Sequence, residues 1–533
     1  MEVDCIPFRK TGYFSQLICD YLDEHEDLKP FYNRFPNLKG FLNQLQEKAK
    51  NYPEHHRPIL SEALLKQYEG LEISESTLQN INSLKYGHTF TVVTGHQLNL
   101  FSGPLYFLYK IISTINLCEE LKATYPENTF VPVYWMASED HDFDEINYFN
   151  FQGKKIQWNR TSGGAVGRMD LSGLEEVFEV MSAKLGGANN ANQIKALFRK
   201  AYLEQETLAS ATRVLANALF GNLGLVVLDG DDATLKRLMV PYMKKDIFEQ
   251  LPFQKVLESI EQLSEVSSDY RIQVNPREIN YFYLKEDLRE RIVQKDGHYL
   301  VNDTDMVFTK TELDHEMEAH PERFSPNVIA RPLYQEVILP NLCYIGGGGE
   351  LAYWLELKDY FQGVGITFPV LLLRNSALVL TEKQSEKIKK LDLKMADLFL
   401  KQNSLINKKI RQISNIDIDF SPQKKVLADQ FSDLYVLAQL TDKSFLGAVQ
   451  AQEIKQKKGL DTLEKRLLKA QKRKLKDHVV RLIELQNQLF PNYSLQERQL
   501  NFSELYLEHG KDLIPKLKNA LDPMKLSFLI LWD

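Results

Sequence analysis

The sequence has little cysteine, and no two of its cysteines form a CxxC pair. A disulfide framework and a thiolate zinc site are therefore not expected. Long apolar runs are also missing, because the longest ones, such as VPVYWMA, fall far short of the roughly 20 residues that cross a bilayer. The first residues lack the charged-then-apolar pattern of a signal peptide. We therefore expect a cytoplasmic protein with no membrane partner.

An excess of positive charge is absent as well, since 65 basic residues stand against 72 acidic ones and the formal net charge is −7. No overall field recruits nucleic acid, so we expect no nucleic-acid partner. The local exception is residues 454–476, where ten Lys and Arg face only Asp461 and Glu464. A solvated helix face is the interpretation we favour for this run, with RNA or nucleotide phosphates as the alternative.

The composition that remains, 44% hydrophobic and 26% charged, is typical of a globular protein, and 533 residues suggest about three to four structural units. TFTVVTG (residues 89–95) indicates a buried strand that ends in a loop. Ser102 then caps a predicted helix that opens at Pro104, and a second strand covers residues 129–138. A strand, a helix and a strand in about fifty residues form a βαβ unit, which predicts parallel strands in an α/β sheet. Further predicted strands are residues 224–232, 337–345 and 366–373.

The character of the chain changes near residue 381. Leu468, Leu475, Leu482 and Leu489 stand seven residues apart, which predicts a heptad seam suited to an antiparallel helical hairpin or a dimer contact. We divide the chain into a core with N-terminal helices (1–150), a first insertion (151–221), core (222–250), a second insertion (251–324), core with a glycine-rich loop (325–380), a helical coiled coil (381–510) and a return to the core (511–533).

The first candidate site is the loop that follows the strand at 89–95. Its glycines allow a ligand to approach the backbone, and a following helix N-terminus favours an anion. His96 is the predicted catalytic residue, because it can position or neutralise charge that develops during group transfer. A plain strand-to-helix turn is the alternative. The predicted substrate-binding residues are Thr94, Gly95, Gln97, Asn99 and Ser102, and Gly95 is also a predicted nucleotide contact.

The second candidate is the acidic turn after the strand at 129–138. Asp140, His141 and Asp142 are predicted catalytic residues, and Glu139 is predicted to bind substrate. So many acidic groups resist simultaneous ionisation unless a cation, an ammonium group or solvent relieves them. The turn lies where open α/β sheets bind ligands. The alternative is a solvated loop in which Asp142 only orients His141. We predict no resident metal ion.

The third candidate spans residues 325–354. Four consecutive glycines cost backbone entropy, which a close ligand approach would explain, although a flexible turn is the alternative. Arg331 can clamp a carboxylate or phosphate in bidentate fashion, and Glu350 can contact an amine. Cys343 lies in an apolar strand and is interpreted as a core residue. The predicted substrate contacts are Asn327, Arg331, Gln335, Glu350, Tyr353 and Trp354, and the predicted nucleotide contacts are Gly346, Gly347, Gly348 and Gly349.

Several long motifs together resemble one known family. TGHQLNLFSGPLYFLYKIIS, VPVYWMASEDHDFDEIN, SPNVIARPLYQEVILPN, YIGGGGELAYW and LQERQLNF are similar to the bacillithiol-biosynthesis cysteine-adding enzymes, the BshC family, in family order over essentially the whole chain. The resemblance implies a Rossmann-like core of the class I nucleotidyltransferase type, two connecting-peptide insertions and a C-terminal α-helical coiled coil that makes a homodimer.

The activity that the resemblance implies is a ligase that joins L-cysteine to glucosaminyl-malate through an amide bond, the last step of bacillithiol biosynthesis. A nucleotide, ATP or ADP, is the expected activating co-substrate, with magnesium as a candidate ion and no zinc. The loop Thr94–Gln97 occupies the place of the HIGH signature of class I synthetases, but it reads TGHQ, and no KMSKS-like loop follows near residues 374–390. Two alternatives stay open: a nucleotidyltransferase or ligase acting on another amino or sugar acid, and a non-catalytic scaffold subunit.

Overall fold

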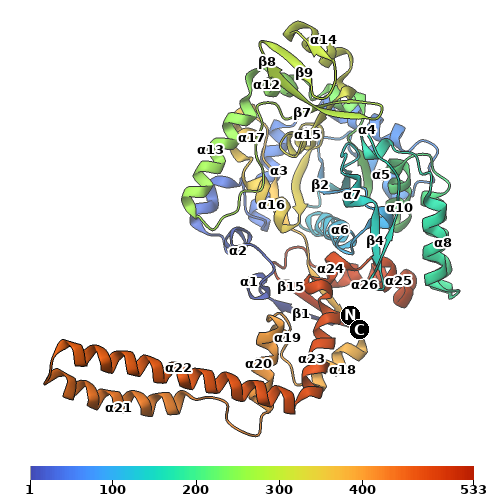
Figure 1. The fold of residues 1–533 in the computed structure, drawn as a ribbon. Helices are drawn as coiled ribbons and strands as arrows, with labels where there is room; N and C mark the ends of the chain where they lie inside the picture. Colours follow the sequence, from blue (N-terminus) through green and yellow to red (C-terminus); the bar gives the residue numbers. More distant parts are fainter. Residues whose placement is uncertain (1, 533) are drawn as a thin grey trace. The chain divides into compact units, whose positions relative to one another are not determined.

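The computed structural model describes residues 2–532, which fall into two compact units (Figure 1). The first unit combines the chain up to Val379 with the segment from Ser494 onward, and the second is Leu380–Tyr493. The helices that follow residue 493 therefore belong to the first unit, whereas the sequence division placed residues up to 510 with the coiled coil. Among the described residues, no helix has the length and apolarity needed to cross a bilayer.

The first unit is built on a five-stranded sheet whose strands are all parallel. Its order is β13-β12-β2-β3-β6. The chain therefore adds β3 and β6 on one side of β2 and then adds β12 and β13 on the other side. This is the doubly wound arrangement of a Rossmann-like fold, and the order reverses between β2 and β12. The strands are β2 (Thr89–His96), β3 (Thr129–Met136), β6 (Val226–Asp229), β12 (Asn341–Gly346) and β13 (Val370–Leu373).

Helices cover the sheet because its strands are apolar on both faces. All eight residues of β2 are buried, and α6 (Tyr106–Thr124), the crossover from β2 to β3, buries twelve of its nineteen residues. Phe41 of α3 and Leu117 of α6 join Val92, Leu342 and Leu372 in the main core. The other helices of this part are α1 (Phe8–Thr11), α2 (Gln16–Leu22), α3 (Leu38–Asn51), α4 (His56–Gln67), α5 (Glu75–Ser83), α15 (Ala330–Ile338), α16 (Gly348–Leu355) and α17 (Lys358–Val364).

Two segments interrupt the strands of the core sheet. The first forms an antiparallel hairpin followed by three helices: α7 (Phe143–Ile146) leads into β4 (Tyr148–Phe151) and β5 (Lys154–Gln157), then α8 (Leu174–Leu185), α9 (Asn189–Tyr202) and α10 (Leu208–Phe220). After β6, three helices follow: α11 (Ala233–Arg237), α12 (Val240–Glu249) and α13 (Leu251–Val266). The second insertion then forms an antiparallel sheet of β7 (Tyr281–Lys285), β8 (Leu288–Lys295), β9 (His298–Val301), β10 (Val307–Phe308) and β11 (Phe324–Pro326), with α14 (Lys310–Ala319). Asp296 and Gly297 both have positive φ between β8 and β9, the conformation that an Asp-Gly hairpin turn requires.

The end of the chain joins a small separate sheet rather than the parallel one. β15 (Phe528–Trp532) lies between β1 (Glu2–Ile6) and β14 (Ala377–Leu380) and pairs antiparallel with β1. The helices α24 (Gln496–Gln499), α25 (Phe502–His509) and α26 (Leu513–Ala520) precede it. A buried ion pair between Arg374 and Glu497, 2.7 Å apart, attaches α24 to the segment that leads into β14.

The second unit is helical and contains a long antiparallel hairpin. Phe431 and Ala438 of α21 pack against Val449 of α22, and Lys424 pairs with Glu464 across the two helices. The basic run lies mostly exposed on α22, which fits the solvated-face interpretation. The predicted heptad is interrupted, because Leu475 lies between the end of α22 at Lys474 and the start of α23 at Lys476. The helices are α18 (Glu382–Lys390), α19 (Met395–Leu398), α20 (Gln402–Ile413), α21 (Ser421–Gln439), α22 (Lys443–Lys474) and α23 (Lys476–Leu489).

Two local predictions are wrong. Residues 337–338 end α15 rather than begin a strand, because a short buried apolar run has the same pattern in a helix and in a strand. Ser102 does not cap α6, which starts at Tyr106. Instead Ser102 ends a short 3₁₀ turn with a φ of 67°. Long-range contacts hold this turn: Asn501 donates hydrogen bonds to the carbonyls of Phe101 and Gly103.

Candidate active site

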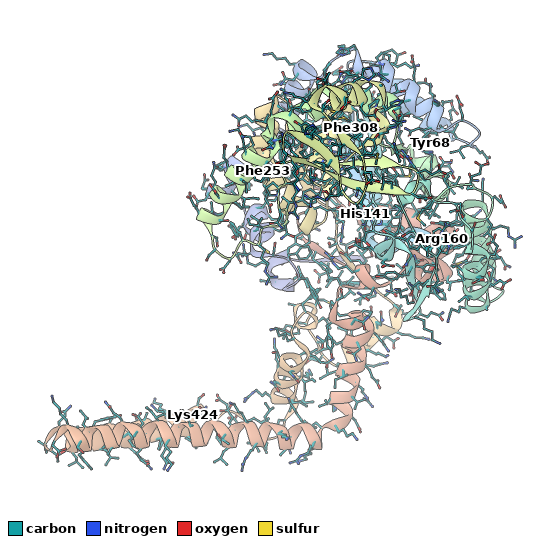
Figure 2. All side chains as sticks on the ribbon, turned by 45° about the horizontal axis from the view of Figure 1, so that its top comes forward. Tyr68, His141, Arg160, Phe253, Phe308 and Lys424 are labelled. Atoms are coloured by element: carbon teal, nitrogen blue, oxygen red, sulfur yellow. The ribbon has the colours of Figure 1, made fainter. Side chains whose placement is uncertain are left out.

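A cavity of about 500 Å³ opens at the carboxyl ends of β2, β3 and β12, beside the place where the strand order reverses. Ligands of open α/β sheets bind in this crevice. Figure 2 shows His141 at this site, in that view between the β7–β11 sheet, which carries Phe308, and the first insertion, which carries Arg160. Ten of the residues predicted from sequence line it: Gly95, His96, Gln97, Glu139, Asp140, His141, Asn327, Arg331, Glu350 and Tyr353.

The first loop brings a backbone carbonyl and a histidine to the cavity. The Gly95 carbonyl accepts a hydrogen bond from Lys110, a buried lysine of α6, at 2.6 Å. A side chain at position 95 would crowd the cavity, because its Cβ would lie 3.3 Å from the Tyr344 hydroxyl. His96 is buried, and burial, together with the charge of Lys110, holds its pKa well below the usual range. His96 is therefore neutral at physiological pH, and the positive charge beside it belongs to Lys110 and Arg374.

The acidic turn is stabilised by its own backbone and by side chains from two other segments. Gln97 donates to Asp140 at 3.0 Å, and the His141 backbone N–H donates to the same carboxylate at 2.8 Å. Burial raises the pKa of Asp140, but the hydrogen bonds from His141 and Gln97 outweigh it and lower the pKa well below its ordinary value. On its other side, His141 Nδ1 lies 2.7 Å from the guanidinium of Arg289, a residue of β8 whose guanidinium stacks on Phe282. Asp140 is thus a fixed anion at neutral pH.

Glu139 differs from Asp140 because it is almost fully buried. Its carboxylate pairs with Lys236 of α11 at 2.5 Å, and Lys236 also reaches Asp231 at 3.3 Å. Burial raises the pKa of Glu139 to about 7 despite the opposing effect of Lys236. Arg168 of the first insertion pairs with Asp231 at 2.6 Å, so the negative charge under the cavity is matched by two cations. Burial and the ion pair with Lys236 therefore act on the pKa of Glu139 in opposite directions.

Arg331 is the cation of α15 that faces the first loop. Its guanidinium lies 5.6 Å from the Tyr344 ring centroid and 5.8 Å from that of Trp135, and Nη1 donates to Gln335 at 3.1 Å. The second terminal nitrogen, Nη2, is buried without a hydrogen-bond partner among the described residues. An unpaired buried donor is costly unless a ligand satisfies it. Arg331 Nη2 therefore has capacity for one further hydrogen bond at the cavity wall.

The glycine-rich loop serves the fold more than the cavity. Glu350 uses both carboxylate oxygens internally: Oε1 accepts from Lys110 at 2.7 Å, and Oε2 accepts the Gly347 backbone N–H at 2.6 Å. These bonds close the N-terminus of α16 and leave Glu350 little capacity to bind a substrate amine. None of the four glycines, Gly346 to Gly349, lines the cavity.

Two alanine substitutions separate packing from flexibility in this loop. In Gly346→Ala, the new Cβ would lie 2.7 Å from Leu351 Cδ1 and 2.9 Å from Tyr344 Cε1, so we expect a loss of about 1–3 kcal/mol in the free energy of unfolding. Gly349→Ala is the matched control, because its Cβ meets nothing within 4 Å inside α16 and should be neutral or stabilising by up to about 1 kcal/mol. Urea unfolding measures both; equal effects would contradict the packing argument.

Six other predicted residues lie off the wall of this cavity. Thr94 donates to the Ile345 carbonyl at 2.8 Å, and Gln335 donates to Glu336 at 2.9 Å, so both hold neighbouring elements together. Trp354 is fully buried and stacks on Tyr344. Asp142 is exposed and Ser102 is buried in its 3₁₀ turn. Asn99 lines a different cavity, described below. Within residues 2–532, no group of three or more His, Cys, Asp or Glu side chains is arranged to hold a metal ion.

The comparisons with known proteins cover both units. The model of the bacillithiol biosynthesis BshC N-terminal Rossmann-like domain matches residues 1–375, and that of the BshC C-terminal coiled-coil domain matches residues 377–532. The chain belongs to the BshC family. A relative from Flavobacterium johnsoniae, named "Putative cysteine ligase BshC", is 58% identical over 531 residues and covers 100% of both chains. Relatives of the same name from Christiangramia forsetii and Bacillus cereus (strain ATCC 14579) are 56% and 28% identical, covering 100% and 97% of this chain and 99% and 97% of their own.

This BshC-family chain is an enzyme of bacillithiol biosynthesis, and three cations of its site escaped the sequence analysis. Lys110 had a usable signal, because it is the one charged residue in the apolar stretch LYFLYKIISTINL, and a lone lysine there must be paired. Arg289 and Lys236 had no such signal in the sequence. Arg289 lies in an ordinary hairpin strand and Lys236 on a short helix, and only the packing of these elements on the sheet brings both to the acidic turn.

Proposed function

We propose that the protein is a ligase that joins L-cysteine to glucosaminyl-malate through an amide bond, the last step of bacillithiol biosynthesis. The observation that supports this proposal best is the single cavity in which an unpartnered arginine nitrogen, that of Arg331, lies with the carboxylates of Glu139 and Asp140. Such a cavity suits a reaction between a carboxylic acid and an amine. The name of the relatives is consistent with this activity.

The reaction forms a bond between the cysteine carboxyl carbon and the sugar amine nitrogen. In water this condensation is unfavourable, so the carboxyl must first become an acyl phosphate or an acyl adenylate. We propose ATP or ADP as the activating nucleotide and magnesium as its counter-ion. Arg331 and Lys110 supply positive charge beside the backbone of Gly95 at the cavity wall, which suits a carboxylate that is being activated.

Proton transfer in the proposed reaction is assigned to the acidic turn. The sugar amine arrives as an ammonium ion and must lose a proton before it attacks the activated carboxyl. Glu139, whose pKa burial raises to about 7, can accept that proton at neutral pH. Asp140, a fixed anion, then orients the amine without taking its proton.

The direct test uses the purified full-length protein with cysteine, glucosaminyl-malate and ATP. We expect mass spectrometry to show the condensed thiol and an equivalent amount of ADP or AMP, which also identifies the activated intermediate. No product with either ATP or ADP would refute the proposal and favour the scaffold alternative. A different amide formed from another amino acid would favour the alternative ligase.

We also propose that the protein is a cytoplasmic homodimer that associates through the second unit. Apolar side chains are exposed on α21 and at its end, among them Val426, Val436, Leu437 and Leu440. Such residues on one helical segment are typical of an interface. Light scattering should give twice the chain mass, and a monomer at micromolar concentration would contradict this part of the proposal.

A further inference from the structure

A second cavity of about 350 Å³ lies next to the first one in the same unit. Its wall combines residues after β2 with the start of the first insertion and with α24. Gln97 lines both cavities, and the Tyr106 ring of the second cavity packs edge-on against His96 of the first at 5.5 Å between ring centroids. The lining residues are Gln97, Asn99, Gly103, Pro104, Tyr106, Glu145, Tyr148, Phe149, Asn150, Arg498 and Gln499.

The side-chain amide of Gln97 lies between the two cavities and contacts a carboxylate in each of them. Gln97 Nε2 donates to Asp140 of the first cavity at 3.0 Å and to Glu145 of the second at 2.9 Å. Two carboxylates therefore converge on one nitrogen donor. Each carboxylate can accept further hydrogen bonds, so a ligand ammonium beside Gln97 would meet acceptors of opposite charge.

The second cavity also has an unsatisfied polar atom at its floor. Asn99 is 9% exposed, and its Oδ1 is buried without a hydrogen-bond partner among the described residues, although its Nδ2 donates to the Glu145 carbonyl. A buried acceptor without a donor costs free energy, which a ligand hydroxyl would recover. Amide groups and tyrosine rings side by side suit a sugar, which has hydroxyls at its rim and apolar C–H faces.

Arg498 gives the cavity one positive charge. Its guanidinium is exposed at the cavity, and within residues 2–532 no acidic side chain forms an ion pair with it. An arginine without an internal partner favours a ligand carboxylate or phosphate. The wall therefore combines a site for an amine, donors and acceptors for hydroxyls, and a site for an anion.

We propose that this second cavity binds the amino-sugar acceptor, an aminohexose that carries a carboxylate substituent, with its amine directed at the Glu145 carboxylate beside Gln97 and its carboxylate at Arg498. This inference deepens the proposed function and rests on it for the identity of the acceptor. The volume, at the small end of the range for ligand sites, suits a ligand of monosaccharide size. The amine then faces the first cavity, where the proposed cysteine carboxyl is activated.

Calorimetric titration of the full chain with glucosaminyl-malate, without cysteine or nucleotide, tests the anion contact. Arg498→Gln should weaken binding about 10- to 100-fold, the loss expected for one charge-assisted hydrogen bond. Arg271→Gln, at an exposed arginine outside both cavities, is the matched control and should leave the affinity unchanged. Equal affinities of Arg498→Gln and the native chain would overturn the proposal.

The N-acetyl derivative of glucosaminyl-malate, which has no ammonium group, tests the amine contact. The native chain should bind it at least about 10-fold more weakly than the free amine, and Glu145→Gln should reduce this ratio. An unchanged ratio in Glu145→Gln would place the amine elsewhere. Adenosine diphosphate that competes with the sugar conjugate, and loses affinity in Arg498→Gln, would assign the cavity to a nucleotide and overturn the proposal.

These measurements stay separate from the proposed ligase activity, because binding is read without turnover. Affinity for glucosaminyl-malate that depends on Arg498 supports the acceptor site even if no amide forms, in which case only the proposed reaction fails. Conversely, an Arg498→Gln protein that makes the amide with an unchanged KM for the sugar refutes the acceptor site and leaves the ligase proposal intact.

Discussion

An Arg331→Gln protein should form the amide at least about 100-fold more slowly than the native chain, because it lacks the guanidinium that is expected to hold the carboxylate under activation. Glutamine keeps a hydrogen-bonding group near Gln335 but removes the charge and the unpartnered Nη2. The rate of product formation at saturating cysteine and at limiting cysteine, measured by mass spectrometry, shows whether the loss is in kcat, in KM or in both.

Two further variants make this result specific. Arg331→Lys keeps the positive charge without the planar pair of nitrogens, so it should recover only part of the rate. Arg271→Gln, at the exposed arginine, should keep the native rate. A native rate in Arg331→Gln, with an unchanged melting temperature, would remove Arg331 from the site and with it the main support for the proposed carboxylate position.

Asp246→Asn should make the protein more stable at pH 8, by about 4 kcal/mol in the free energy of unfolding. Asp246 of α12 is fully buried; its Oδ1 accepts the Asn280 backbone N–H at 2.8 Å, and its Oδ2 has no partner among the described residues. Burial raises the pKa of this carboxyl from 3.8 to about 7. Asparagine keeps the Oδ1 acceptor and cannot ionise.

The effect depends on pH in a defined direction. Between about pH 4 and pH 7 the folded protein keeps the Asp246 proton while the unfolded chain releases it, so the native protein loses stability as pH rises through this window. The Asp246→Asn protein does not lose stability in this way, because asparagine has no proton to release. The difference between the two proteins in urea unfolding should therefore be small near pH 4 and reach its full value above pH 7. Asp305→Asn, at an exposed position, is the control; a difference that does not change with pH would contradict the buried-carboxyl argument.

The parallel sheet could be predicted because its signal is local. TFTVVTG and the run at residues 129–136 are β-branched and aromatic, end in turn residues and flank an apolar helix, so the strand–helix–strand unit follows from the sequence. The boundary between α15 and β12 could not be placed, because Val337 and Ile338 are apolar and buried in either conformation. The start of α6 was misplaced for a related reason: Asn501, about 400 residues away, fixes the turn before it.

The glycine-rich loop shows how composition can mislead. Four consecutive glycines suggested that a ligand approaches the backbone closely. In the structure, a side chain at position 346 would crowd Leu351 and Tyr344, and the Gly347 N–H donates to Glu350. A glycine that close packing requires and a glycine that a ligand requires look the same in a sequence. Only the positions of the neighbouring side chains in the folded protein distinguish the two. The nucleotide role of these glycines stays a prediction without a contact to the cavity.

The sequence by itself determined that three polar loops follow neighbouring parallel strands, because hydrophobic periodicity and turn residues are local properties and strand ends of a βαβ sheet share one edge. Only the tertiary structure decided the charges at that edge. Arg289 and Lys236 come from elements whose own patterns say nothing of the site, and burial sets the protonation of His96 and Glu139. Burial and ion pairing depend on which segments pack together, and that information is spread over the whole chain rather than held in any one motif.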